Sequence, residues 1–271
     1  MQPANQIQLK LIRLLGLVVG GAVIASFMAP RIAQDPAYHQ FADTRPLLGI
    51  PNSLDVVSNV PFAIVGLAGL VAVSRLRSCE RWPYAALFVG TTLTSIGSAY
   101  YLLAPDNWTL VWDRLPMTIG FMGLLTAALA ERVSVRIART LFLPLLVFGA
   151  VSVAYWYWTE TRGAGDLRPY MLVQFGSLLI ILMALLASPS RYGDDHFFYL
   201  GLGAYLLAKV FESADRSVYD FGQIVSGHTI KHLMAAVGLW FIVEMIRQRT
   251  AGESTKQGPP YVVVNSTRLS S

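Results

Sequence analysis

The chain has 271 residues, of which 54% are hydrophobic and 14% are charged, and its formal charge is +5. Soluble domains carry roughly 25% charged residues, so this composition excludes an ordinary soluble domain and predicts an integral membrane protein. The single cysteine, Cys79, excludes an intramolecular disulfide and a cysteine-built metal cage. The basic excess does not indicate a nucleic-acid partner, because membrane proteins gather basic residues in cytoplasmic loops.

Eight apolar segments follow one another, each near the ~20 residues that a helix needs to cross a bilayer. They comprise residues 11–29, 54–74, 83–103, 112–130, 138–158, 169–188, 196–212 and 228–247. We therefore expect an all-α fold, a polytopic membrane helix bundle. Lys10 and Arg13 precede the first segment, but Phe27 and Ala29 form a poor signal-peptidase site. Residues 1–30 are therefore expected to be an uncleaved N-terminal transmembrane anchor.

Basic residues are distributed unequally between the two sets of loops. With a cytoplasmic N-terminus, most of them fall on the cytoplasmic side, among them Arg75, Arg77 and Arg81. This bias predicts that both termini are cytoplasmic. Residues 250–271 are polar without an apolar pattern, and we expect them to form a disordered cytoplasmic tail.

Polar residues within the apolar segments fall at one membrane depth in this topology. His228 and His232 begin the last segment, and residues four apart share one face of a helix. Asp113 begins the fourth segment, Ser98 lies near the end of the third, and Ser58 begins the second. Polar groups inside a membrane are expensive and usually functional. Their convergence from four helices predicts a site near the outer face.

Each of these residues has a functional and a structural interpretation. Two histidines on one face supply half of a tetrahedral zinc shell, yet they also suit a hydrogen-bonded or interfacial pair. Asp113 would orient or deprotonate a metal-bound water, or it would interact with the dipole of its own helix. Ser98 would donate to a developing oxyanion, or it would bond to a carbonyl one turn back.

Three further residues carry oxygen ligands of the type that hard cations prefer. Asp43, Asn52 and Asp55 lie before or at the start of the second segment. Their spacing matches no EF-hand loop, and capping of the second helix by Asn52 or Ser53 is an alternative interpretation. They are the candidates for a second cation site.

The order of the motifs resembles that of the alkaline ceramidase family, a branch of the CREST superfamily of seven-helix membrane hydrolases. The resemblance rests on Gly97-Ser98, on Asp113-Arg114-Leu115-Pro116-Met117 and on His228-x-x-x-His232, and it covers about residues 43–241. Residues 54–60 are similar to the first core helix of the family. The resemblance implies a seven-helix ceramidase-like domain over residues 31–249, with the first span as an addition.

The family resemblance also implies Zn²⁺ held by three histidines, a water oriented by Asp113 and a carbonyl assisted by Ser98. His228 and His232 match two of the ligands, but the third position is occupied by Leu102. Catalytic zinc usually has three protein ligands and a water. Asp113 would then become the third ligand, or Tyr101 or His39 would substitute, or the site has lost its metal. The family further implies a calcium site, for which the three oxygen-bearing residues above are the local candidates.

Two functions follow from these observations. The first is a ceramidase-like hydrolase of the bacterial inner membrane, which cleaves the linear amide of an N-acyl lipid with a metal-activated water. The second is a non-catalytic protein that binds a membrane lipid or small molecule and keeps the fold with a degraded metal site, as Leu102 favours. Both interpretations have the bilayer and a membrane lipid as partners.

Overall fold

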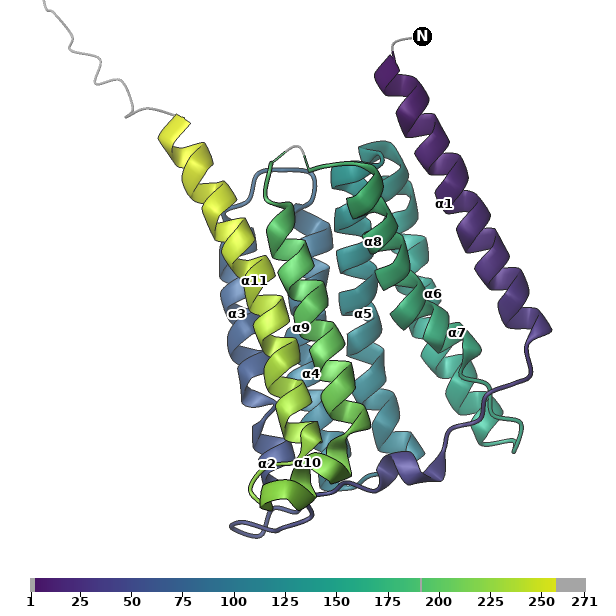
Figure 1. Ribbon diagram of the computed structural model, residues 1–271, viewed down its shortest axis with the longest axis vertical. Helices are drawn as coiled ribbons and strands as arrows, with labels where there is room; N and C mark the ends of the chain where they lie inside the picture. The colour runs from purple at the N-terminus through teal and green to yellow at the C-terminus, as the bar shows by residue number, and fades with distance from the viewer. Residues whose placement is uncertain (1–2, 191, 257–271) are drawn as a thin grey trace, which may run out of the picture.

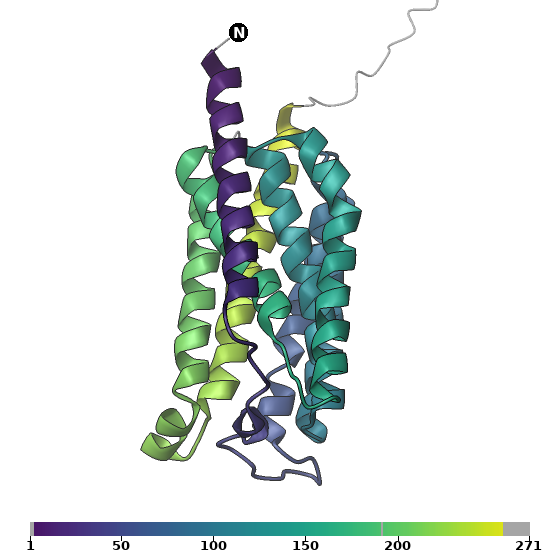
Figure 2. The same cartoon turned by 90° about the vertical axis from the view of Figure 1, so that its right-hand side faces the viewer.

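The computed structural model describes residues 3–190 and 192–256, and the regular structure of these residues is helical apart from one isolated β-bridge between Leu47 and Ile50. The helices are α1 (Pro3–Met28), the 3-10 turn η1 (Pro36–His39), α2 (Ser53–Val57), α3 (Val60–Ser74), α4 (Arg81–Leu103), α5 (Asn107–Arg132), α6 (Val135–Glu160), α7 (Arg168–Met171), the π-helical turn η2 (Leu172–Gly176), α8 (Ser177–Ala187), α9 (Asp195–Ser213), α10 (Asp215–Gly222) and α11 (Gly227–Lys256). Figures 1 and 2 show a bundle of roughly parallel long helices.

Several of these helices are built to cross a bilayer. Five helical stretches are long and apolar enough, namely Ser53–Ser74, Arg81–Leu103, Val135–Glu160, Arg168–Ala187 and Gly227–Ala251. The pair α9 and α10 provides a sixth if it counts as one span, although it is bent by 73°. An all-α membrane bundle is therefore confirmed.

Two of the predicted spans do not satisfy the same criterion. The apolar part of α1 is the shorter stretch Ile12–Met28. Helix α5 has 26 residues, but it carries Asp113, Arg114 and Glu131. It packs against α4, α6 and α8 and lies in the middle of the bundle (Figure 1), so much of its surface faces protein instead of lipid. A seven-helix core with an added N-terminal span stays a prediction.

The two ends of the bundle differ in character. The start of α1 and the end of α11 lie at one end, and residues 29–52, α2 and α10 lie at the other, which we name the loop end (Figure 1). Helix α11 continues to Lys256, so residues 250–256 of the predicted tail are helical. The rest of that predicted tail, 257–271, lies outside the described residues.

Small residues bring α4 and α5 close together. A Cβ added at Gly97 would overlap the carbonyl oxygen of Trp112, and one at Gly90 would lie 2.6 Å from the backbone nitrogen of Gly120. Small residues at a membrane-helix interface allow such close backbone approach. This contact fixes the start of α5 against the end of α4, where the candidate residues lie.

A buried polar network holds the opposite end. Glu131 accepts hydrogen bonds from Nη1 of Arg249 at 2.7 Å and from the Tyr84 hydroxyl at 2.5 Å. Arg249 also donates from Nε to Asp194 at 2.5 Å. Helices α4, α5 and α11 are thereby tied to the start of α9 at the end away from the candidate site.

Candidate functional site

The start of α11 is organised by side chains that accept its free backbone N–H groups. Asp215 Oδ1 accepts from the His228 nitrogen at 2.8 Å, and Ser226 Oγ accepts from the Thr229 nitrogen at 2.9 Å. Such capping satisfies donors that have no partner within the helix. As a result both histidines project from an ordered first turn, buried, with ring centroids 4.7 Å apart.

His232 is held in one tautomer by its neighbours. Its Nδ1 lies 2.7 Å from Ser58 Oγ, and the same hydroxyl donates to the Asp55 carbonyl at 2.6 Å. A hydroxyl has a single hydrogen, so Ser58 must accept from His232. The hydrogen-bond network therefore assigns the proton to Nδ1 and leaves the lone pair on Nε2, the nitrogen that would accept a hydrogen bond or bind a metal.

Apolar side chains occupy the position that the resemblance gives to the third histidine. Leu102 is fully buried in a cluster with Phe41, Tyr101 and Trp156. The Phe41 ring also packs on His228, with centroids 4.7 Å apart. Leu102 is thus part of a packed core at the loop end.

His39, which the sequence analysis considered as a replacement third ligand, forms hydrogen bonds with other residues. Its Nδ1 lies 2.9 Å from the Tyr101 hydroxyl, and its Nε2 lies 3.0 Å from Asn107 Oδ1. Tyr101 in turn donates to the Tyr38 carbonyl at 3.3 Å. These bonds fix η1 on the ends of α4 and α5 and explain why neither residue is free to ligate.

The described residues do not complete a zinc site. Among residues 3–190 and 192–256, no three His, Cys, Asp or Glu side chains gather in a group that could hold a metal ion. Asp113 therefore does not join His228 and His232 as a third ligand in this arrangement. Because catalytic zinc usually has three protein ligands, the donor set does not fit that ion, and zinc stays a prediction from the resemblance.

Ser98 and Asp113 lie side by side, in agreement with the prediction that they share one membrane depth. The close contact of Gly97 with Trp112 puts the buried Ser98 beside the Asp113 carboxylate. Helix α5 begins nearby in a capping box, in which Asp106 accepts from the Thr109 nitrogen at 2.7 Å. That bond from the backbone of Thr109 is the main reason why the pKa of Asp106 is lowered.

The three residues of the predicted second cation site have separate partners. Asp43 accepts from Nε and Nη2 of Arg45 at 2.8 and 2.7 Å, and chiefly these bonds lower its pKa. Asn52 Nδ2 donates to the Leu102 carbonyl at 2.7 Å. Asp55 Oδ1 accepts from Ser226 and Thr229 at 2.6 and 2.5 Å.

Calcium binding therefore stays a prediction from the resemblance. The capping role considered for Asn52 is wrong, because its side chain makes no cap hydrogen bond and its backbone is left-handed at φ 47°. Its amide instead ties residues 50–53 to the end of α4, which positions Asp55 under the start of α11.

One half-buried ion pair escaped the sequence analysis. Lys231 lies between the two histidines and pairs with Glu212 of α9 at 2.8 Å, and Glu212 also pairs with Lys209. The signal in the sequence was a lysine within an apolar helix, because a charge at that depth requires a partner. The pair binds the loop end of α9 to that of α11.

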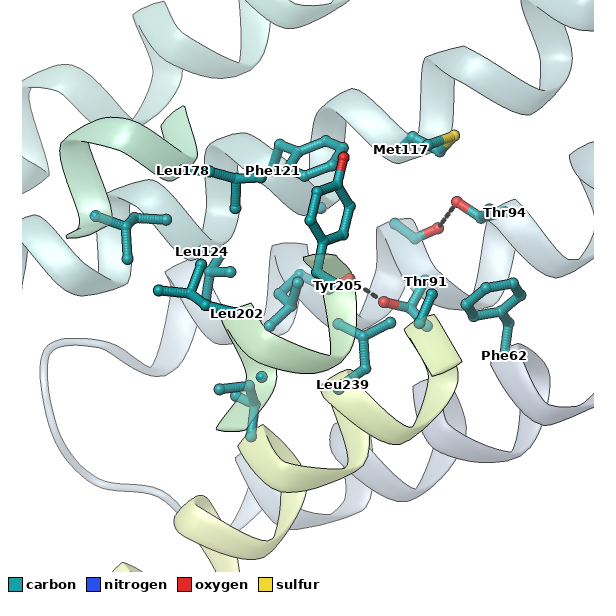
Figure 3. A pocket seen from close by; sticks show the side chains of 18 of the residues that line it. Phe62, Thr91, Thr94, Met117, Phe121, Leu124, Leu178, Leu202, Tyr205 and Leu239 are labelled. Carbon is teal, nitrogen blue, oxygen red and sulfur yellow. Dashed lines mark hydrogen bonds between the residues drawn. The ribbon is translucent and has the colours of Figure 1, made fainter. Parts of the chain in front are cut away.

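A cavity of about 150 Å³ lies between the helices, deeper in the bundle than the histidines. Figure 3 shows its lining, which includes Phe62, Thr91, Thr94, Met117, Phe121, Leu178, Tyr205 and Leu239. The hydroxyls of Thr91 and Thr94 donate to backbone carbonyls of their own helix at 2.9 and 2.8 Å, so their methyl groups complete an apolar wall. Phe62 also contacts the His232 ring, with centroids 5.6 Å apart, and so connects the cavity to the histidine pair.

Comparison with known proteins adds no assignment. No protein-family model matches the chain, and no curated protein matches it at a significant level. The resemblance to alkaline ceramidases therefore rests on the sequence motifs alone, those at Ser98, Asp113, His228 and His232 and the segment 54–60.

Proposed function

We propose that this membrane protein binds an amphiphilic lipid inside its helix bundle, with the alkyl part in the cavity described above. The apolar cavity, which lies beside a polar loop end, is the observation that carries the proposal. A dry cavity of ~150 Å³ lined by Leu, Ile and Phe is large enough to bind benzene. This cavity therefore accommodates part of an alkyl chain, and the remainder of the lipid would extend toward the polar groups.

The polar groups for the other part of the lipid lie in the adjoining layer. Tyr205 lines the cavity and its hydroxyl accepts from Gln174 Nε2 at 2.7 Å. Beyond it lie the Lys231–Glu212 pair and the two histidines. Apolar burial drives the chain inward, at roughly 25 cal/mol per Å² of area, and the polar layer orients it.

Photolabelling in nanodiscs tests this function. Palmitate and ceramide that carry a diazirine on the acyl chain would be irradiated with the protein, and labelled peptides identified by mass spectrometry. We expect label on cavity-lining Met117 or Leu239. Ala235→Phe puts a ring into the cavity and should abolish the internal label.

Val237→Phe is the matched control, because it adds a ring on the exposed side of the same helix. It should leave the internal label unchanged. Label restricted to the lipid-facing surface of the native protein, with both probes, would overturn the proposal.

A second proposal is the amide hydrolase that the resemblance implies, acting on N-acyl lipids. Its support is the meeting of Ser98 with Asp113 and the buried pair His228 and His232, at the positions that the family motifs name. No third ligand joins them within the described residues, so this function requires a donor set that the present arrangement does not supply.

Zinc per polypeptide, measured by elemental analysis, decides whether this second function merits assays. One zinc in the native protein that is lost in His228→Ala would support it, and hydrolysis that disappears in His232→Ala would then establish it. A native protein without zinc, with zinc gained by Leu102→His, would remove the hydrolase and leave the lipid-binding proposal intact.

A further inference from the structure

Arg114 is a buried cation that is attracted through space to the carboxylate of the neighbouring Asp113 but forms no ion pair with it. It lies on α5, 5% exposed, and no ion pair involving it forms within the described residues. Its one hydrogen-bonded partner in the part of the chain that the structure describes is neutral, since Nη2 donates to Gln34 Oε1 at 2.7 Å. Arg249, by contrast, forms ion pairs with Glu131 and Asp194 at the opposite end of the bundle.

Aromatic rings surround this guanidinium. Its Cζ lies 4.2 Å from the ring centroid of Trp156, 4.8 Å from that of Tyr170 and 5.5 Å from that of Tyr38. Ring faces stabilise a cation. They do not, however, supply an acceptor for the N–H groups, which point outward in the plane of the guanidinium. We name Arg114, Trp156, Tyr170 and Tyr38 the arginine cage.

Two hydrogen-bond donors of the cage have no acceptor among the described residues. They are Nη1 of Arg114 and the indole Nε1 of Trp156, both buried. An unsatisfied buried donor destabilises the folded state, more so when it is charged, and an unpaired buried charge is costlier still. The chemical group that satisfies a cation and two N–H donors together is an oxyanion, which guanidinium groups bind in bidentate fashion.

The cage is continuous with the cavity along two helices. Arg114, Met117 and Phe121 lie at i, i+3 and i+7 and so share one face of α5, and the latter two line the cavity. On the neighbouring element, Tyr170 of the cage is followed by Gln174, which bonds to Tyr205, a lining residue. Both elements therefore run from the loop end into the bundle, with the cage residue first and the cavity-lining residues after it.

We infer that the arginine cage binds the carboxylate or phosphate of a single-chain amphiphile whose alkyl chain enters the cavity. This inference rests on the proposed lipid-binding function and adds the charge of the head group. Arg114 supplies the charge, the Trp156 N–H supplies a second donor, and Tyr38 and Tyr170 hold the guanidinium plane in place.

Matched ligands separate this inference from lipid binding in general. Calorimetric titration of the detergent-purified protein would use oleate, dodecyl phosphate and oleyl alcohol, with acetate and inorganic phosphate as anions that lack a chain. We expect at least one anionic amphiphile to bind roughly ten-fold or more tightly than oleyl alcohol, as a charge-assisted hydrogen bond provides. Acetate or inorganic phosphate binding as tightly as the amphiphiles would identify a free anion as the occupant of the cage.

Substitutions then locate the effect. Arg114→Gln should remove the preference for the anion and leave oleyl alcohol binding unchanged, which also reports that this variant is folded. Trp156→Phe, which keeps an aromatic ring and deletes one donor, should reduce the preference in part. Arg162→Gln is the control, because Arg162 stacks on the Trp158 ring at 4.7 Å on the surface, and it should have no effect.

The contrary outcomes are distinct. Equal affinity for the alcohol and both anionic amphiphiles, or an anion preference that survives in Arg114→Gln, would overturn the arginine cage as an anion site while lipid binding stands. Failure of every ligand with a chain to bind would overturn both proposals together.

Discussion

At the scale of single residues, the loop end shows how one partner decides the role of a side chain. Asp43 and Asp55 are both buried carboxylates, but Asp43 is neutralised by Arg45, whereas Asp55 accepts only hydroxyl hydrogen bonds and its Oδ2 has no partner among the described residues. His232 is oriented by Ser58, and His228 is covered by Phe41. Residue type alone would not separate these cases.

The Asp43–Arg45 pair predicts a loss of stability in acid. Hydrogen bonds from Arg45 lower the pKa of Asp43 below its ordinary value of 3.8. A carboxylate with a lowered folded-state pKa contributes stability that is fully present above the unfolded value and is lost as the pH falls through the folded one. Asp43→Asn should therefore lower the melting temperature at pH 7 and the difference should shrink below about pH 4.

Thermal melting of the two proteins in detergent across this pH range provides the measurement. Asp35→Asn serves as the control, because Asp35 caps η1 at an exposed position and has no arginine partner within the described residues. A difference between native protein and Asp43→Asn that stays constant down to pH 3 would contradict the role assigned to Arg45.

At the scale of secondary-structure elements, the contact of α4 with α5 decides the geometry of the candidate site. Gly97 touches the backbone of α5 at Trp112, and the next residue on each helix is a site residue, Ser98 and Asp113. Helix α11 contributes from the other side through its capped first turn. The site therefore lies where three helix ends meet. The close approach of Gly97 fixes α4 against α5, and capping hydrogen bonds fix the start of α11.

Gly97→Ala should be strongly destabilising for this reason. The added Cβ overlaps the carbonyl oxygen of Trp112, a backbone atom that cannot rotate away, so α4 and α5 must separate. Overpacking of this kind costs about 1–3 kcal/mol. A lowered melting temperature of the purified protein would report it.

Gly203→Ala is the matched change, because a Cβ at that helical position meets nothing within 4 Å. Alanine favours a helix over glycine by about 0.5–1 kcal/mol, so this variant should melt at the same temperature or higher. Equal melting of the two variants would mean that the α4–α5 contact is looser than described.

At the scale of the whole molecule, the bundle has an ordered ion network at one end and a polar site at the other. The network around Glu131 and Arg249 joins four helices at the end where α1 begins and α11 ends, and the apolar cavity lies between the two polar regions. This division suits a protein whose ligand enters the half that carries the loop end. The distribution of basic residues predicts that the end where α1 begins faces the cytoplasm.

Thiol labelling determines that orientation. Cys79 lies between α3 and α4 on the predicted cytoplasmic side, and Leu48 is fully exposed at the loop end. A membrane-impermeant maleimide should label Leu48→Cys, in a Cys79→Ser background, from outside intact cells, and should reach Cys79 of the native protein only in inverted vesicles. The reverse pattern would show that the prediction from basic residues is wrong.

The sequence alone determined what depends on near neighbours in the chain. Apolar segments, the shared face of His228 and His232, and the meeting of Ser98 with Asp113 at one depth all follow from helix geometry and membrane thickness. In the structure, these residues lie at helix ends that are capped or closely packed. The departure at Leu102 was likewise visible in the sequence.

Only the tertiary structure decided the rest, because it depends on residues far apart in the chain. The cluster that buries Leu102 and the commitment of His39 to Tyr101 and Asn107 arise from the way residues 29–52 cross the ends of α4 and α5. Arg114 appeared in the sequence only as part of a motif. Its cage forms because α6, α7 and η1 bring Trp156, Tyr170 and Tyr38 onto one guanidinium, and no local pattern encodes a contact among four separate elements.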